Sequence, residues 1–249
     1  MGIKERRKKI IFSLFFIKDI EESPVFFTEE IQKIFDISLN AKGKDTIGDL
    51  VEQGTIFKFE ENSQVSYQLS NSGYEELSLE FPFCRFLRDN WDGKWRIVSY
   101  EIPEKQRDLR DKLRREVSSW GLGPWHRSFW ITPHPIIPYL QKLVANKEEE
   151  KYIQAFDSDH VFGMKEVLIN KVWDLKSLEV SYKNLFKNWH NILATENSND
   201  KKFSLIVSEY IKILRTDPGL PKEILDERWI GFEAFAIFKD IRKILLKTK

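Results

Sequence analysis

The order of periodic patterns in the first 70 residues constrains the fold of this chain most strongly. Three stretches have the apolar spacing of amphipathic helices, and two short stretches with alternating apolar residues follow them. The helices are expected at residues 4–17, 29–35 and 44–53, and the strands at 55–59 and 65–70. Three helices followed by a β-hairpin is the element order of a winged helix-turn-helix, which we predict for residues 1–82.

The middle of the chain alternates strand and helix patterns. Runs rich in β-branched and aromatic residues alternate with helical runs, in chain order at 95–102, 104–120, 125–132, 139–145 and 152–156. This order predicts a ferredoxin-like α+β domain over residues 85–165. Such a domain needs one more strand, which the sequence places either within 159–162 or through a split of the run 125–132.

The last third of the chain has only helical patterns. Helices are expected at 167–173, 175–193, 203–214 and 229–246, with an evident turn at Asp217–Pro221. We therefore predict a C-terminal helical domain over residues 166–249. The predicted fold class is α+β, with a winged helix, a ferredoxin-like domain and a helical domain in that order.

The composition fits a packed protein of a reducing compartment. Of the 249 residues, 41% are apolar and 14% aromatic, which excludes a disordered chain. A single cysteine, Cys84, excludes an internal disulfide. No apolar run approaches the roughly 18–20 residues that span a bilayer, and the run Ile10–Ile17 lacks a cleavage site for a signal peptidase. We expect a cytoplasmic protein without a membrane partner.

Charge is unevenly distributed, although the net charge is only +1. Residues 1–20 carry six Lys/Arg and two acids, whereas residues 21–80 carry four lysines and thirteen acids. Residues 81–135 are mildly basic, with eleven Lys/Arg and seven acids. Carboxylates oppose contact with a polyanion, so most of the first domain has an acidic surface that could instead contact a protein.

Patterns that carry catalysis or bind metal are absent from the sequence. The four histidines (126, 134, 160 and 190) do not have the spacing of metal ligands, and one cysteine cannot form a zinc knuckle. There is no nucleophile elbow and no glycine-rich phosphate loop. We expect no cofactor and no resident metal, and the patterns do not indicate an enzyme.

Three stretches resemble the PaaX family of transcriptional repressors. They are Trp91–Pro135, which begins WDGKWRIVSYEIPEKQRD, VWDLKSLEVSYKNLF at 172–186, and DPGLPKEILDERWIGFEAFAIF at 217–238. The resemblance implies a winged helix, a central ferredoxin-like domain and a C-terminal helical domain. It further implies a homodimer that binds double-stranded operator DNA and releases it when an aromatic acyl-CoA thioester binds. The expected function is therefore that of a DNA-binding regulator.

The central segment also resembles the small ferredoxin-like nuclease of CRISPR spacer acquisition. The similar residues are a strand that ends in Ser99–Glu104, a basic helix, and a Gly-Leu-Gly turn before the next strand. In that nuclease an aspartate at the end of this strand is linked to a divalent metal across a dimer. This chain has Glu101 there, so a metal-dependent nuclease with Glu101 as its candidate catalytic residue is an alternative function.

A DNA-binding winged helix presents polar and basic side chains from its third helix and its wing. The candidates for DNA contact in this chain come from those two elements and from the basic first helix: Lys42, Lys44, Thr46, Gln53, Lys58, Arg6 and Arg7. The acidic neighbours of these residues leave open a winged helix that contacts a protein.

Aromatic residues of the central segment could form a pocket for an effector. Indole rings would line it, and guanidinium groups would meet a phosphate or carboxylate. The candidates are Trp95, Arg96, Trp125, Arg127 and Trp130. The same aromatic residues would also serve as an ordinary core, and that alternative stays open.

Overall fold

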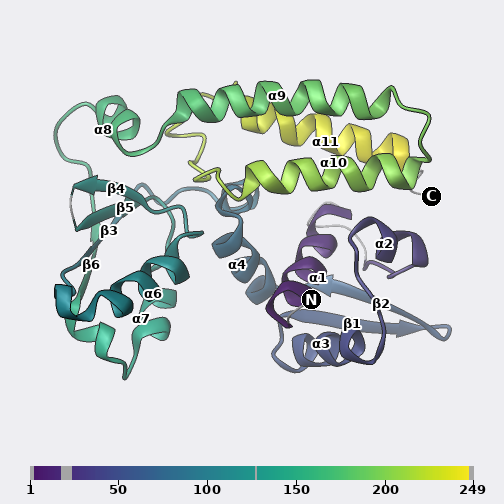
Figure 1. Cartoon of the computed structure of the whole chain (residues 1–249), viewed down its shortest axis with the longest axis horizontal. Coiled ribbons are helices and arrows are strands. Elements are labelled where there is room, and N and C mark those ends of the chain that lie inside the picture. The colour runs from purple at the N-terminus through teal and green to yellow at the C-terminus, as the bar shows by residue number, and fades with distance from the viewer. Residues whose placement is uncertain (1–2, 18–23, 127, 247–249) are drawn as a thin grey trace. The chain divides into compact units, whose positions relative to one another are not determined.

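The computed structural model describes residues 3–17, 24–126 and 128–246 (Figure 1). The chain forms two compact units. Unit 1 consists of Met1–Leu77, Tyr182–Ile213 and Ile230–Lys249, and unit 2 of Ser78–Ser181 and Leu214–Trp229. The fold class is α+β with a C-terminal helical region, as predicted. The predicted boundaries at 1–82, 85–165 and 166–249 stay a prediction about modules of the sequence.

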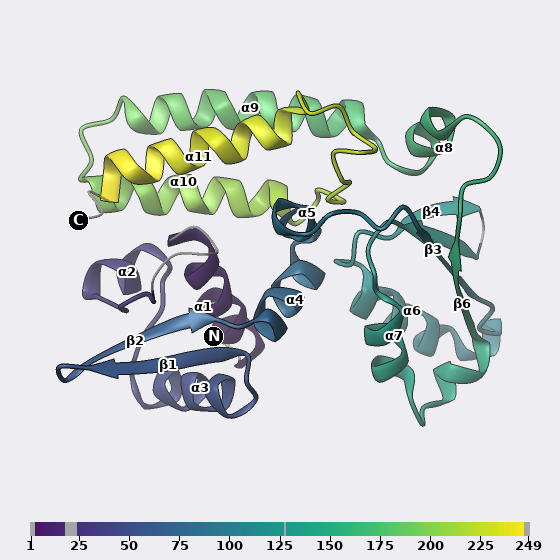
Figure 2. The ribbon, with the colours of Figure 1, turned by 180° about the vertical axis from the view of Figure 1, so that it is seen from behind.

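The N-terminal part of unit 1 has the expected order of elements. The helices are α1 (Ile3–Ile17), α2 (Glu29–Ile34) and α3 (Ala41–Glu52), and the strands are β1 (Ile56–Glu61) and β2 (Gln64–Leu69). Helix α3 begins before the predicted residue 44 because the Asn40 side chain accepts a hydrogen bond from the Gly43 N–H (3.0 Å) and caps it. The two strands form an antiparallel hairpin that pairs Ile56 with Leu69 and Glu61 with Gln64 (Figure 2).

The C-terminal helices complete the core of unit 1. They are the part of α9 (Leu175–Leu193) from Tyr182 onward, α10 (Asn199–Leu214) up to Ile213, and α11 (Ile230–Leu246). Phe238 of α11 lies 5.4 Å, ring to ring, from Phe16 of α1 and 5.1 Å from Tyr210 of α10. The buried Arg242 side chain donates a hydrogen bond to the Phe16 carbonyl (3.3 Å). First and last helices therefore share one aromatic core.

Unit 2 contains a four-stranded antiparallel sheet in the order β4-β5-β3-β6. The strands are β3 (Trp95–Tyr100), β4 (Gly123–His126), β5 (Phe129–Thr132) and β6 (Ile153–Ser158). With α6 (Arg107–Val117) after β3 and α7 (Ile137–Val144) after β5, this is the ferredoxin-like order of elements. The strand that was hard to locate comes from the split of the run 125–132.

The remaining elements of unit 2 include two helices that are shared with unit 1, and the others are short. They are α4 (Asn71–Glu80), α5 (Arg85–Arg88), α8 (Lys165–Val172), the start of α9, and 3-10 turns at Pro82–Cys84, Glu104–Gln106 and Glu148–Tyr152. The structure describes no helix that is both long and apolar enough to cross a membrane.

The two faces of the unit 2 sheet are both apolar. Helices α6 and α7 cover one face, where Val98 of β3 packs with Leu113 and Leu140 (Figure 1). Side chains alternate along a strand, so Trp95 and Ile97 of β3 point to the opposite face. There the Trp95 ring stacks on that of Trp173, just after α8, with 6.1 Å between ring centroids.

The Asp217–Pro221 turn is anchored inside unit 2 by a buried histidine. His134 Nε2 donates a hydrogen bond to the Pro218 carbonyl (2.8 Å), and its ring stacks on Phe86 (5.0 Å). Burial and, to a smaller extent, the positive charges of Arg85 and Arg96 lower the pKa of His134 to about 3, although the hydrogen bond to the Pro218 carbonyl acts in the opposite direction. His134 is therefore neutral in the folded chain at neutral pH.

This histidine makes the stability of unit 2 depend on pH. Unfolded His134 binds a proton near pH 6.5 and folded His134 only near pH 3, so the unfolded state binds the extra proton between these values. The free energy of unfolding is expected to fall by about 2 kcal/mol from pH 7 to pH 5, at about 1.4 kcal/mol per pH unit below the unfolded pKa. Urea unfolding at the two pH values measures it.

The control is His134→Gln, whose amide can still donate to the Pro218 carbonyl. The other ionisable groups are the same in both proteins, so their contributions cancel in the difference between variant and parent. From pH 7 to pH 5, the free energy of unfolding should fall by about 2 kcal/mol less in the variant than in the parent. An unchanged dependence in the variant would show that His134 is not the group responsible.

Candidate functional site

The first turn of α3 exposes two lysines. Lys42 and Lys44 are exposed, and the structure describes no ion pair for either ammonium group. Thr46 is buried at 4% exposure, and its hydroxyl donates to the Lys42 carbonyl (2.8 Å). Of the three residues predicted at the start of this helix, the two lysines can reach a ligand and the threonine supports the helix that carries them.

The arginines of α1 hold unit 1 together. Arg7 donates to both carboxylate oxygens of Glu76 in α4 (2.6 and 2.7 Å) and also to Gln53 and Thr55 (2.7 and 2.9 Å). The hydrogen bond with Glu76 raises the pKa of Arg7 despite its partial burial. Arg6 Nε lies 3.4 Å from the Thr46 hydroxyl. Arg7, predicted to contact phosphate, thus has an internal role, and so does its partner Gln53.

The hairpin has few cations and two exposed aromatic rings. Its predicted contact residue, Lys58, pairs with Glu60 (3.4 Å). Phe57 and Phe59 are 53% and 42% exposed, and both belong to the same face of β1 because side chains alternate. Because Lys58 is paired with a carboxylate, it is a weak ligand for phosphate. Lys42 and Lys44 are therefore the main basic residues of α3 and the hairpin.

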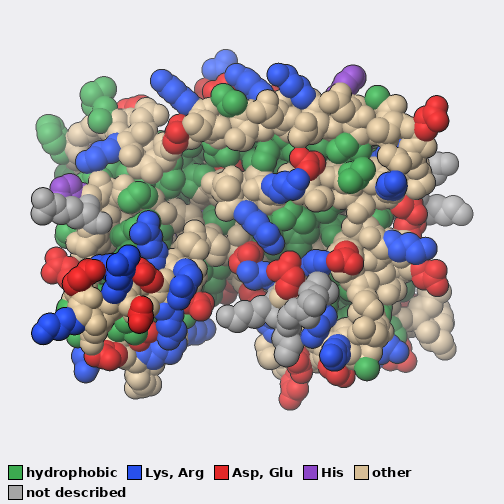
Figure 3. All heavy atoms as spheres, in the orientation of Figure 1, with side chains coloured by type: hydrophobic (Ala, Val, Ile, Leu, Met, Phe, Trp, Pro, Cys, Tyr) green, Lys and Arg blue, Asp and Glu red, His purple; other side chains and the backbone are tan. Residues whose placement is uncertain are grey.

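The outer face of the unit 2 sheet forms one wall of an open groove of about 700 Å³. This wall consists of Trp95, Ile97, Trp125 and Ile131. The opposite wall is the segment 158–164 together with Val167, Leu168 and Lys171 of α8. In Figure 3, hydrophobic side chains project into solvent around α8 and the loop before it.

Two of the five predicted effector residues, Trp95 and Trp125, line this groove. Trp130 lies on the other face of the sheet, where its ring stacks on Tyr100 (6.2 Å) beneath the Arg114 guanidinium (5.6 Å). Arg127 lies outside the described residues. The groove residues not predicted from the sequence include Val161, Phe162 and Met164, whose only signal is an apolar run directly before a helix.

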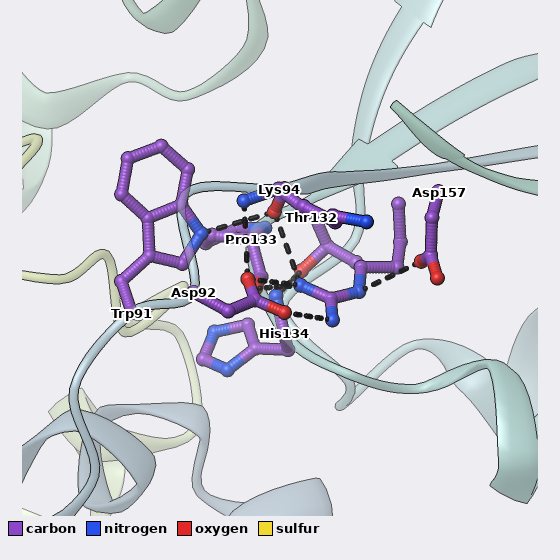
Figure 4. Close-up of polar contacts among 8 residues, drawn as sticks. Trp91, Asp92, Lys94, Thr132, Pro133, His134 and Asp157 are labelled. Atoms are coloured by element: carbon purple, nitrogen blue, oxygen red, sulfur yellow. Dashed lines mark hydrogen bonds and ion pairs between the residues drawn. The ribbon is translucent and has the colours of Figure 1, made fainter. Parts of the chain in front are cut away.

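The buried guanidinium of Arg96 is the centre of a polar network (Figure 4). It donates to both carboxylate oxygens of Asp92 (2.8 and 2.5 Å) and pairs with Asp157 (3.1 Å). It also donates to the carbonyls of Lys94 and Pro133 (3.1 Å each). Partial burial raises the pKa of Asp92, but the hydrogen bonds from Arg96 and the Lys94 N–H outweigh it, so the net pKa is lowered. Arg96 therefore fixes the turn before β3, and its predicted contact with an effector stays a prediction.

Glu101 lies exposed just after β3. Its N–H donates to the Tyr152 carbonyl (3.1 Å). Among the described residues, no group of three or more His, Cys, Asp or Glu side chains could hold a metal ion. Glu101 is therefore not part of a metal site within one described chain, and the nuclease alternative, which has the metal between two chains, stays a prediction.

Comparison with known proteins identifies the class. The model of the PaaX protein central Cas2-like domain matches residues 88–167, and that of the PaaX-like protein C-terminal domain matches residues 173–248. These matches cover well over half of the 249 residues. They describe a two-module chain in which a Cas2-like sheet domain precedes a helical domain. The chain belongs to the PaaX family.

Two individual proteins are similar to this chain. The transcriptional repressor PaaX of Escherichia coli K12 is 21% identical over 182 residues, which are 68% of this chain. The match spans only 57% of that repressor's length. The solved structure of the uncharacterized protein Rv0674 from Mycobacterium tuberculosis has a TM-score of 0.52 and 17% identity, and the match covers 97% of this chain and 96% of that one. This second likeness concerns the fold alone.

Proposed function

We propose that this protein is a DNA-binding transcriptional regulator, a repressor that acts as a homodimer in the cytoplasm. The observation that carries the proposal is the exposed pair Lys42 and Lys44 at the start of α3, the third helix before a hairpin. In a winged helix-turn-helix the N-terminal residues of this helix approach the base edges in the major groove. The similarity to a PaaX repressor supports the same function.

The proposed DNA-binding surface has few cations, and this number determines how much of its affinity can come from phosphate contacts. Asp45 and Asp49 are exposed on α3 beside the two lysines, and they oppose deep contact with phosphates. Each phosphate neutralised adds about 0.9 to the slope of log affinity against log salt. A protomer that relies on two lysines should therefore show a slope of about −2. Base contacts must then supply much of the affinity.

Replacing both lysines with alanine should weaken binding to the operator at least about tenfold and reduce the salt slope by about 2 per protomer. The matched control removes the same charge from unit 2 by replacing two exposed residues, Lys105 in the 3-10 turn before α6 and Arg115 in α6. Fluorescence anisotropy with a duplex from the region upstream of the gene measures both. Equal loss in the two double variants would show that α3 is not the reading helix.

A second candidate function is supported by the hairpin. Phe57 and Phe59 are exposed beside Glu60 and Glu61, where a DNA-binding wing would have cations. Exposed aromatic residues with an acidic rim suit a protein partner better than a nucleic acid. In this alternative the first 80 residues contact a protein. Selective DNA binding that depends on Lys42 and Lys44 would exclude it as the main function.

A further inference from the structure

The hairpin of unit 1 has an open edge and an exposed aromatic face (Figure 2). Strand β2 lies between β1 and Val25, which forms an isolated bridge with Tyr67, so β1 is the outer strand. Phe57 and Phe59 project from the same face of β1 and are about half exposed. No further strand of the described chain pairs with β1. An outer strand of this kind can accept one more strand from another chain.

The backbone of β1 directs the polar groups of two residues towards the open edge. Tyr67 exchanges two backbone hydrogen bonds with Val25 (2.7 and 2.8 Å), so its N–H and C=O point away from β1. The residue opposite Tyr67 in the hairpin is Lys58. Lys58 therefore belongs to a pair without backbone hydrogen bonds, and so does Glu60, because the two kinds of pair alternate. The N–H and C=O groups of Lys58 and Glu60 thus point outward, where a second strand would meet them.

The side chains of β1 favour a second copy of the same strand as the partner. In an antiparallel pair with two-fold symmetry, one residue lies opposite its own copy. A pair centred on Phe59 places Lys58 of each copy opposite Glu60 of the other. This arrangement gives two ion pairs and an aromatic contact at the centre. Phe57 of each copy then lies diagonal to Phe59 of the other, within reach of its ring.

The neighbouring registers are less favourable. A pair centred on Lys58 places two ammonium groups opposite each other, and one centred on Glu60 places two carboxylates opposite each other. A pair centred on Phe57 gives no ion pair, because Lys58 then lies opposite the buried Ile56. A lysine on an outer strand normally discourages pairing, but in the register centred on Phe59 the facing carboxylate compensates its charge. The sequence of β1 is therefore complementary to itself in one register.

We propose that β1 is a surface for self-association, at which the hairpins of two copies join into one four-stranded antiparallel sheet. Lys58 and Glu60 of the two copies exchange backbone hydrogen bonds and form ion pairs, and the two Phe59 rings meet at the two-fold axis. One strand edge buries less than the roughly 1,000 Å² of a stable interface, so the association is weak and depends on protein concentration. It involves no DNA and does not rest on the proposed function.

Disulfide cross-linking of the full chain tests the register. Opposite residues in a pair without backbone hydrogen bonds have Cα atoms about 4.5 Å apart, which suits a disulfide, so Phe59→Cys should form a linked dimer on mild oxidation. Phe57→Cys is the matched control, because the two copies of residue 57 are about 13 Å apart in this register. Phe59→Cys should cross-link at least about tenfold faster. Equal rates, or no cross-linking of either variant, would overturn the proposal.

The native cysteine of the chain provides the blank. Cys84 is buried, and burial raises the pKa of its thiol, which keeps it in the unreactive form. The parent chain, which has Cys84 and both phenylalanines, should therefore form no linked dimer under the same oxidation. Its rate is subtracted from the rates of the two variants.

Two charge variants test the ion pairs between copies. In the Phe59→Cys chain, Lys58→Glu places only carboxylates at the paired positions and Glu60→Lys only ammonium groups. Each variant alone should cross-link at least about threefold more slowly than the Phe59→Cys chain. An equimolar mixture restores opposite charges, so mixed dimers, identified by tags of different size, should form at about the original rate. A mixture as slow as the single variants would contradict the ion pairs.

The outcome can be separated from that of the proposed function, because cross-linking is measured without DNA. A chain that links at position 59 but selects no operator retains this surface and loses only the proposed function. A chain that selects its operator but does not link there retains the function and refutes the pairing. If Phe59→Cys does not fold, sedimentation velocity on Lys58→Glu, Glu60→Lys and their mixture replaces it. Only the mixture should then sediment faster as concentration rises, and equal behaviour of all three would overturn the proposal.

Discussion

Replacing Gly219 with alanine is expected to destabilise unit 2 by about 3 kcal/mol or more. Gly219 has φ +62°, a left-handed conformation that a side chain disfavours. A Cβ atom would lie 2.2 Å from the Pro82 carbonyl carbon and 2.3 Å from the Phe83 nitrogen. These are backbone atoms that no rotamer change can move aside. Urea unfolding monitored by tryptophan fluorescence measures the loss.

Gly93 is the matched control for this variant, because it separates backbone strain from collision. It also belongs to unit 2 and has φ +78°, but nothing lies within 4 Å of the position of its Cβ atom. Gly93→Ala should therefore cost only about 1 kcal/mol of conformational strain. If the two variants are equally destabilised, the close packing of the Asp217–Pro221 turn against Pro82 is not what stabilises this region.

Replacing Arg96 with methionine is expected to cost about 2–4 kcal/mol of stability. The guanidinium is 7% exposed and forms bonds with two carboxylates and two backbone carbonyls. Asp92 and Asp157 are about half exposed, so water partly replaces the guanidinium there. The buried Pro133 carbonyl loses its Arg96 donor, and an unsatisfied buried acceptor adds to the cost, whereas the Lys94 carbonyl still accepts from Trp91 Nε1 (3.0 Å). Thermal or urea unfolding measures the change.

An exposed arginine provides the comparison. Arg107 on α6 is 68% exposed and pairs with Asp111 at 3.7 Å. Surface pairs of this kind contribute about 0–1 kcal/mol, so Arg107→Met should be nearly neutral. Arg96→Lys should recover only part of the loss, because an ammonium cannot reproduce the fork to Asp92. If Arg96→Met lowers the free energy of unfolding as little as Arg107→Met does, the network is not a main support of the sheet.

The order of elements could be predicted because it depends on local patterns. Helices and strands are specified by apolar spacing, by caps such as Asn40, and by turns such as Asp217–Pro221. The β4–β5 hairpin was ambiguous because the aromatic and β-branched residues of the short run 125–132 fit either one strand or two. In the structure this region forms two antiparallel strands, in which Pro124 of β4 pairs with Trp130 of β5.

The roles of individual cations could not be predicted, because their partners are distant in sequence. Arg7 and Glu76 are 69 residues apart, and Arg96 bonds to a carbonyl 37 residues away. A basic residue in a helix or strand has the same local pattern whether it meets phosphate or a buried carboxylate. Two residues predicted for an effector pocket, Trp95 and Trp125, do line a groove, whereas the apolar segment opposite them was not predicted; an effector at this site stays a prediction.

The most direct test of the proposed regulator is a salt-titrated binding measurement on the purified full chain. A fluorescent duplex from the region upstream of the gene is titrated with protein in the presence of a scrambled competitor. We expect sequence-selective binding that weakens as salt rises and is retained by the Lys105→Ala/Arg115→Ala variant. Absence of binding at low salt, or equal affinity for the scrambled duplex, would contradict it.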